Sequence, residues 1–354
     1  MRLAGADPRV TVVEPRTEYT EDRTWSFWRT ARDPFADCVR ARWARWAVSA
    51  GGERVVRASP TLRYETLSAM AVYERARHTI DGAANTELAL GTRVVAEPRP
   101  VAGGFVVETD RGACRARRVV DTRPAGGAAG FGQYFLGAEI EVDRAAFDDT
   151  TVELMAFAVP RRDRIDFLYV LPFAADRALV EATSFAPEPP PRAELEAALA
   201  DAVERSAAGR AVREIRREHG FIPMRPQAAH RTAATGHPGW LRAGLVGGAA
   251  RPSTGYAFQR IQRAADALAH ELRRGEVPTP PAVDGPVTRW MDALFLRVVR
   301  RWPAAGPELF HALFKRAPAD RLENFLAGST ASQDRLAVMG ALPPAPFLRE
   351  LLGT

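Results

Sequence analysis

The stretch that decides the fold is residues 240–262, WLRAGLVGGAARPSTGYAFQRIQ. It combines an apolar, strand-like run over 241–246, a loop of glycine and small residues over 247–255, and a helix-compatible run that starts near Tyr256. A strand that leads through a glycine loop into a helix brings bare backbone N–H groups and the positive end of the helix dipole to one point. Such a point suits a phosphate or an electron-rich ring. The alternative is an ordinary strand-to-helix turn.

The loop itself has the composition of a cofactor-binding loop. Gly247 and Gly248 allow a ligand to approach the backbone closely, and Pro252 fixes its φ angle. Ser253 or Thr254 can cap the helix that follows. We therefore take this loop as the candidate cofactor site.

A second sign of a dinucleotide-binding unit is the run RVTVVE at residues 9–14. A short β-branched strand that ends in an acid presents a carboxylate to a ribose hydroxyl, and Glu14 fits that role. The Gly-rich fingerprint of such units lies about 20 residues before the acid, which here would fall before Met1. We therefore expect the chain to begin inside a Rossmann unit, as an N-terminally truncated sequence, with residues 2–7 closing a helix.

Composition narrows the class of protein. The 354 residues carry a net charge of +6, and Lys315 is the only lysine, so the basic side chains are almost all arginine. No basic run is interleaved with aromatics as in nucleic-acid-binding proteins, so we expect no nucleic-acid partner. Cys38 and Cys114 lack metal-site spacing, so no metal is expected. The sequence lacks the roughly 18 consecutive apolar residues of a membrane span and a signal peptide, which predicts a cytoplasmic protein or one peripheral to a membrane.

The order of patterns along the chain predicts an α/β protein in four parts. Residues 1–125 form a partial FAD-type Rossmann domain with a helix over 62–76 and a β meander over 87–123, which delivers Asp121 to a loop. Residues 126–225 form a mainly β substrate domain, residues 226–277 return to the cofactor domain, and residues 278–354 form a helical cap. In the cap, an apolar stripe from Val287 to Trp302 predicts an amphipathic helix that packs on its own domain or lies on a membrane.

One acidic residue stands out in the predicted substrate domain. Runs 165–171 and 178–185 predict a hairpin, and the period of two places Glu181 on the same strand face as Leu179 and Phe185. A carboxyl held among apolar groups has its pKa raised by desolvation and stays protonated near neutral pH, as a general acid requires. The alternative is an acid on a half-exposed strand.

The motifs TEDRTWSFW, LRYETL, VVDTRP, GQYFLGAEIEV, VELMAF, LPFAADRALVEATSF, EHGFIPM, GGAARPSTGYAFQRIQ and MDALFLRVVRRWP through LAVMGALPPAPFL occur in this order. Together they resemble the flavoprotein lycopene β-cyclases of carotenoid biosynthesis over nearly the whole chain. The resemblance implies a Rossmann-type FAD domain, an inserted mixed β-sheet substrate domain and a helical C-terminal cap. It also implies that reduced FAD, with NAD(P)H as reductant, supports cyclisation of lycopene or a related long polyene without net redox change.

The resemblance assigns roles to residues of this chain. Glu181 would be the acid, Glu14 would hold the adenosine ribose, and Arg23 and Trp25 would lie near the flavin or the substrate tunnel. Asp121 joins the cofactor-binding set. The flavin would be lined by Gly247, Gly248, Pro252, Ser253, Thr254 and Gly255.

The sequence also departs from the family pattern. The Gly-rich fingerprint is absent, Ala156 stands where related sequences usually have an aspartate, and Ala182 replaces the second acid of the plant motif. Two other functions stay open: an FAD-dependent monooxygenase or prenyl reductase with true redox chemistry, and an inactive homologue that binds carotenoid or lipid.

Overall fold

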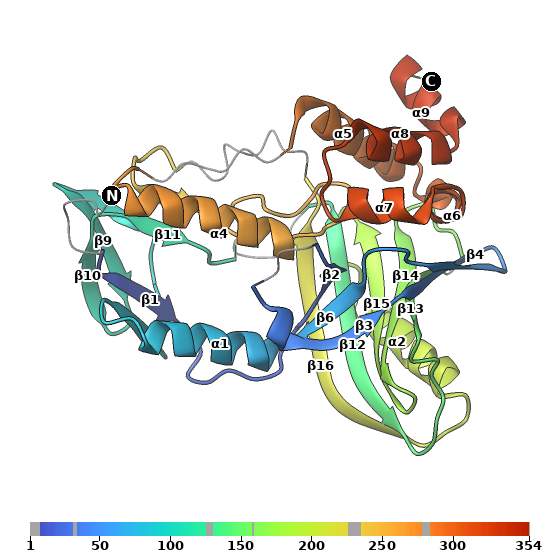
Figure 1. Ribbon diagram of the computed structural model, residues 1–354, viewed down its shortest axis with the longest axis horizontal. Helices are drawn as coiled ribbons and strands as arrows, with labels where there is room; N and C mark the ends of the chain where they lie inside the picture. Colours follow the sequence, from blue (N-terminus) through green and yellow to red (C-terminus); the bar gives the residue numbers. More distant parts are fainter. Residues whose placement is uncertain are drawn as a thin grey trace.

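The computed structural model describes residues 8–30, 34–124, 130–157, 159–225, 235–277 and 284–353. Figure 1 shows the long helices α1 and α4 and short strands at one end, and a broad curved sheet under a group of C-terminal helices at the other. Residues 2–7, expected to close a helix, and most of the linker at 278–286 lie outside the described residues.

The broad sheet has seven strands in the order β16-β12-β15-β14-β13-β4-β5. All neighbours are antiparallel except β13 and β4, so the sheet is mixed, as predicted. The predicted hairpin is confirmed as β14 and β15. The strands are β4 (Arg45–Ala50), β5 (Glu53–Ala58), β12 (Gly132–Val142), β13 (Thr151–Phe157), β14 (Ile165–Ala174), β15 (Arg177–Ala186) and β16 (Val212–Pro223).

Strands β4 and β5 come from the part of the chain that we assigned to the partial FAD-binding domain, residues 1–125. They extend the broad sheet through β13 instead. Their side chains explain the placement, because Trp46 and Val48 of β4 are fully buried in the same core cluster as Val152 of β13. The remaining boundaries of the four-part division stay a prediction.

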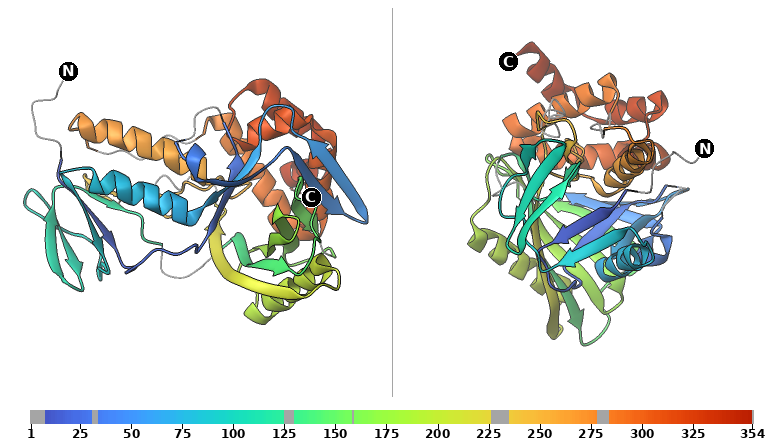
Figure 2. Two further views of the ribbon diagram at one scale, coloured as in Figure 1. Left: turned by 60° about the horizontal axis from the view of Figure 1, so that its bottom comes forward. Right: turned by 90° about the vertical axis from the view of Figure 1, so that its left-hand side faces the viewer.

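The end of the molecule with α1 and α4, where the sequence predicts the cofactor site and which we call the cofactor end, contains two parallel strand pairs, β1 with β7 and β11 with β17. The antiparallel set β8-β9-β10 confirms the middle of the predicted β meander. Helices α1 and α4 run beside these strands in Figures 1 and 2. The elements are β1 (Val10–Glu14), β7 (Thr86–Leu90), β8 (Arg99–Val101), β9 (Gly104–Thr109), β10 (Gly112–Ala116), β11 (Val119–Asp121), β17 (Trp240–Arg242), α1 (Ala69–Asp81) and α4 (Phe258–Arg273).

A small sheet, β2-β6-β3, joins the two ends of the molecule. It consists of β2 (Thr24–Trp28), β3 (Val39–Trp43), which follows the short 3-10 helix η1 (Ala36–Cys38), and β6 (Tyr64–Ser68). The helix predicted over 62–76 is wrong in its first part. Ser68 starts α1 as its N-cap by accepting a hydrogen bond from the Ala71 N–H, and Glu21 accepts bonds from the next free N–H groups, at Ala69 and Met70.

The C-terminal helices cover one face of the broad sheet, and α2 (Arg192–Ala207) covers the other (Figure 1). Alternate residues of β15 divide between the two faces: Leu179 and Phe185 pack under the C-terminal helices, whereas Val180 and Ala182 pack toward α2. The cap helices are α5 (Pro286–Arg301), η3 (Pro303–Ala305), α6 (Gly306–Arg316), α7 (Ala319–Leu326), α8 (Ser332–Ala341) and α9 (Pro344–Leu352). No helix of the described residues is long and apolar enough to cross a membrane.

Candidate active site

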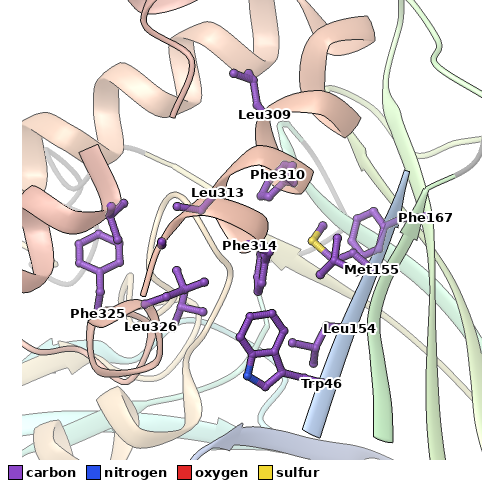
Figure 3. Packing of buried hydrophobic residues seen from close by; sticks show 14 of the residues in the cluster. Trp46, Leu154, Met155, Phe167, Leu309, Phe310, Leu313, Phe314, Phe325 and Leu326 are labelled. Carbon is purple, nitrogen blue, oxygen red and sulfur yellow. The ribbon is translucent and has the colours of Figure 1, made fainter. Parts of the chain in front are cut away.

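An apolar cavity of about 280 Å³ lies between the C-terminal helices and the broad sheet. Figure 3 shows several of its walls, with Phe310 and Phe314 of α6 on the side of Met155 of β13, and Leu313 on the side of Phe325 and Leu326. Polar side chains enter the lining at few points, which are Tyr169, Ser253, Thr254, Tyr256 and Asp292. This lining is suited to an apolar group.

Glu181 lies beside this cavity rather than in its wall. On β15 it stands directly opposite Tyr169 of β14, which lines the cavity, as does Phe185 further along β15. The predicted face is confirmed: Glu181 is buried between Leu179 and Phe185, and Thr183 Oγ1 donates a 2.7 Å hydrogen bond to its Oε1.

Burial and, after it, the nearby Glu218 carboxylate raise the pKa of Glu181 to about 8, against the opposing effects of Thr183 and Arg216. Glu181 therefore holds its proton at neutral pH. The hydroxyl groups of Tyr64 and Tyr169 also lie within electrostatic range of it.

Glu218 is the residue that our sequence analysis missed. It lies on β16, two strands from Glu181, and both residues stand opposite Gly137 of β12. A Cβ atom added at Gly137 would lie 3.3 Å from Glu218 Cγ and 3.5 Å from Glu181 Cβ. The missing side chain thus leaves the two carboxyl groups facing each other across one residue. The sequence carried no local signal for this row, because it depends on how β15 and β16 align with β12.

Glu218 is held in place by two neighbours. Thr24 Oγ1 donates a 2.7 Å hydrogen bond to Glu218 Oε2, and Arg216 forms an ion pair with the same carboxylate. Arg216 in turn donates to Thr24 Oγ1 at 2.8 Å and to Glu139 Oε2 at 2.8 Å. Thr24 belongs to the Arg-Thr-Trp motif of β2, so the structure gives a role to a residue that the sequence marked only by resemblance.

The candidate cofactor loop follows a strand shorter than expected. The strand predicted over 241–246 ends at Arg242, because the chain turns over Gly244 with a left-handed φ of 68°. Gly247 must be glycine, since a Cβ there would lie 2.5 Å from the Arg242 carbonyl oxygen. Gly248 and Gly255 also adopt left-handed φ angles, of 82° and 74°.

The predicted helix cap is wrong. Ser253 Oγ donates a 2.7 Å hydrogen bond to Asp292 of α5, and Thr254 Oγ1 accepts from the Tyr256 N–H at 3.3 Å. Helix α4 begins after Ala257, and no side chain caps its first turn. The N-terminus of α4 therefore keeps backbone donors and the positive end of the helix dipole beside the loop, which fits an anionic or electron-rich ligand.

A buried ion pair ties this loop to the C-terminal helices. Arg251 Nε lies 3.2 Å from Asp292 Oδ2, and both side chains are almost fully buried. Arg251 Nη1 also donates to the Phe325 carbonyl oxygen of α7 at 2.7 Å. The loop, α5 and α7 thus form one unit around Pro252, which is buried with its neighbours.

Glu14 and Arg23 lie in one polar cluster at the cofactor end. The Arg16 guanidinium donates to both oxygens of Glu14 and also to Asp22, and Asp22 accepts from Arg23. Burial tends to raise the pKa of Glu14, but the hydrogen bonds from Arg16 outweigh burial and lower this pKa. The carboxylate of Glu14 is therefore ionised, and both of its oxygens accept hydrogen bonds from Arg16. Trp25 packs against Phe258, the first residue of α4, and so links this cluster to the loop.

Three other predicted positions lie apart from the cavity lining. Asp121 ends β11, where Arg123 pairs with it and outweighs burial to lower its pKa. Ala156 stands opposite Leu168, which packs toward α2, whereas Phe157 packs on Phe310 under the cap. Ala182 also faces α2. A carboxylate at position 156 or 182 of this fold would point away from the cavity.

Comparisons with solved structures identify the fold. A geranylgeranyl bacteriochlorophyll reductase-like protein from Thermoplasma acidophilum matches with a TM-score of 0.57 and 11% identity, over 97% of this chain and 92% of that one. A flavoprotein/dehydrogenase from Cytophaga hutchinsonii matches with a TM-score of 0.56 and 12% identity, over 97% and 93%. At these identities the likeness shows the fold, which is the Rossmann-like fold of FAD-dependent enzymes.

Sequence comparison identifies the family. The family model described as lycopene cyclase protein matches residues 1–352, so the chain belongs to the lycopene cyclase family. A lycopene beta-cyclase from a Paracoccus species is 29% identical over 61% of this chain and 57% of its own length. One from Pseudescherichia vulneris is 27% identical over 55% of this chain and 52% of its own. The chain thus spans little more than half the length of these relatives.

Proposed function

We propose that this protein cyclises the polyene ends of lycopene to β-rings by acid catalysis, with reduced FAD and no net redox change. The observation that carries the proposal is Glu181, a buried carboxyl that keeps its proton at neutral pH beside an apolar cavity. Protonation of the terminal double bond gives a tertiary carbocation, the neighbouring double bond attacks it to close the ring, and loss of a proton ends the reaction.

The cavity suits one end of the polyene at a time. Its volume of about 280 Å³ lies just below the roughly 300–1,000 Å³ of drug-sized ligand sites. The remainder of a long polyene would therefore extend outside it. Phe185, Phe295, Phe310 and their neighbours would keep water from the cation, and the aromatic rings of Tyr169 and Tyr256, which also line the cavity, would stabilise positive charge.

The residues present fit a flavin. Glu14 would hold the adenosine ribose, the loop at 247–255 and the uncapped N-terminus of α4 would hold the flavin, and Arg23 and Asp121 would complete the set. Bound in reduced form, with NAD(P)H as reductant, the flavin supplies electron density that stabilises a nearby cation. Because the ring closure itself transfers no electrons, the chain's own contribution is to position the polyene, exclude water and hold the proton at the Glu181 carboxyl.

The substrate would enter from a membrane surface on the cytoplasmic side. Trp290 of α5, Met339 of α8 and Leu348 and Leu351 of α9 line the cavity and are also exposed to solvent. Arginines on the same helices would favour anionic lipid headgroups. Co-sedimentation with vesicles checks this step: binding to anionic vesicles that is lost in Leu348→Ser/Leu351→Ser is expected, and unchanged binding of that variant would contradict it.

Product stoichiometry tests the proposal against its alternatives. Purified protein with FAD, NAD(P)H and lycopene should form cyclic carotenes with far less than one NAD(P)H consumed per ring. Consumption of one NAD(P)H per product molecule would favour a monooxygenase or a prenyl reductase. Pigment binding without any turnover would favour an inactive homologue.

A further inference from the structure

Glu218 is a buried carboxylate that the proposed reaction has not used, and it stands in one row with Glu181 and Gly137. We propose that Glu218 is a positioning residue that keeps the catalytic proton on Glu181, because its own carboxylate is paired with Arg216 and Thr24. This inference rests on the proposed function in so far as Glu181 is the acid of the reaction.

The strand between the two carboxyls makes the arrangement possible. Any other residue at position 137 would place a Cβ within 3.5 Å of both glutamate side chains. With glycine there, β12 presents no side chain between them, and the charge of Glu218 acts on the buried Glu181 carboxyl. Two carboxylates in one such space resist simultaneous ionisation, and one of them keeps a proton.

The surrounding groups decide which carboxyl keeps the proton. From β16, Arg216 forms an ion pair with Glu218, and from β2, Thr24 donates to the same carboxylate. The groups that face Glu181 are Thr183 on its own strand and the neutral hydroxyls of Tyr169 from β14 and Tyr64 from β6. Arg216 is thus bonded to Glu218, whereas Glu181 forms no ion pair with any other described residue, so the proton is kept on Glu181.

The same arrangement links the acid to the cofactor end. Thr24 lies between Arg23, which belongs to the Glu14 cluster, and Trp25, which packs on Phe258 at the start of α4. Its hydroxyl both donates to Glu218 and accepts from Arg216. A shift of β2 would therefore alter the hydrogen bonds of Glu218 and, through its charge, the protonation of Glu181.

An infrared pH titration of the full chain tests this inference without any turnover. The carboxylic C=O band that disappears in Glu181→Gln identifies Glu181, and in the unsubstituted protein its midpoint is expected at about 8. Glu218→Gln preserves shape and removes the charge, so the midpoint should fall by about one pH unit. Glu218→Asp keeps the charge and should restore most of the high midpoint. Glu214→Gln, on the exposed part of the same strand, is the matched control and should change nothing.

An unchanged midpoint in folded Glu218→Gln would overturn the inference, and so would an equal fall in Glu218→Asp. The pH profile of cyclisation provides the second readout, and its alkaline limb should move down together with the band. If the band moves as expected but the unsubstituted protein forms no cyclic carotene, the carboxyl pair stands and the proposed function fails. If cyclisation occurs but the band does not move, the reverse holds.

Discussion

Replacing Asp292 by alanine tests whether the candidate cofactor loop is held by its buried ion pair. The Asp292 carboxylate accepts bonds from the Arg251 guanidinium and a 2.7 Å bond from Ser253 Oγ. The side chains of Arg251 and Asp292 are only 3% and 2% exposed. The substitution therefore leaves a guanidinium buried, with the Phe325 carbonyl as its remaining acceptor among the bonds described above.

Removing one partner of a buried ion pair costs about 3–5 kcal/mol, because the other charge stays desolvated. The lost Ser253 bond adds about 1 kcal/mol. We expect the free energy of unfolding of Asp292→Ala to fall by about 3 kcal/mol or more. Urea unfolding, monitored by tryptophan fluorescence and circular dichroism, measures this change.

The matched control is Glu276→Ala, which removes the exposed partner of Arg274 just after α4. Exposed pairs of this kind contribute about 0–1 kcal/mol, so this variant should unfold like the unsubstituted protein. If Asp292→Ala also unfolds within about 1 kcal/mol of the unsubstituted protein, the ion pair does not hold the loop and the reasoning is wrong.

Three further substitutions test other parts of the structure. Phe310→Ala removes a ring that packs on Phe157 and Phe295 and should cost about 3–5 kcal/mol in urea unfolding; a cost below about 1 kcal/mol would contradict the packing. Burial raises the pKa of Glu323 above 4.5, so its contribution to stability is lost as pH rises from 4.5 through the folded value. Glu323→Gln should abolish this fall in melting temperature with rising pH. An unchanged pH dependence in the variant would contradict the assignment of the fall to Glu323. Burial tends to raise the pKa of Glu139, but three arginines outweigh burial and hold this pKa at about 2. The contribution of Glu139 to folding stability is therefore present above pH 4.5 and lost as pH falls toward 2. Glu139→Gln should therefore destabilise the protein at pH 7 and much less near pH 2, and an equal loss at both values would refute this account.

Patterns that depend on local periodicity were predictable from the sequence. The hairpin of β14 and β15, the face that Glu181 shares with Leu179 and Phe185, and the helical C-terminal region all follow from the spacing of apolar residues. Each depends on neighbours a few residues apart, which is the range over which a periodic pattern carries information.

Features that depend on long-range register were not predictable. The pairing of β4 with β13 brings residues about a hundred positions apart into one sheet. The row from Glu181 through Gly137 to Glu218 joins three strands, and no segment of the sequence contains it. Serine is a residue type typical of helix caps. The Ser253 hydroxyl instead donates to the Asp292 carboxylate, which tertiary packing brings close.

The most direct test of the central claim is pigment analysis of lycopene-accumulating cells that express this chain or its Glu181→Gln variant at equal soluble levels. The account predicts cyclic carotenes with the unsubstituted chain, and unchanged lycopene with the variant even though the purified variant still binds pigment. Cyclic carotenes formed equally well by Glu181→Gln would contradict the assignment of Glu181 as the acid.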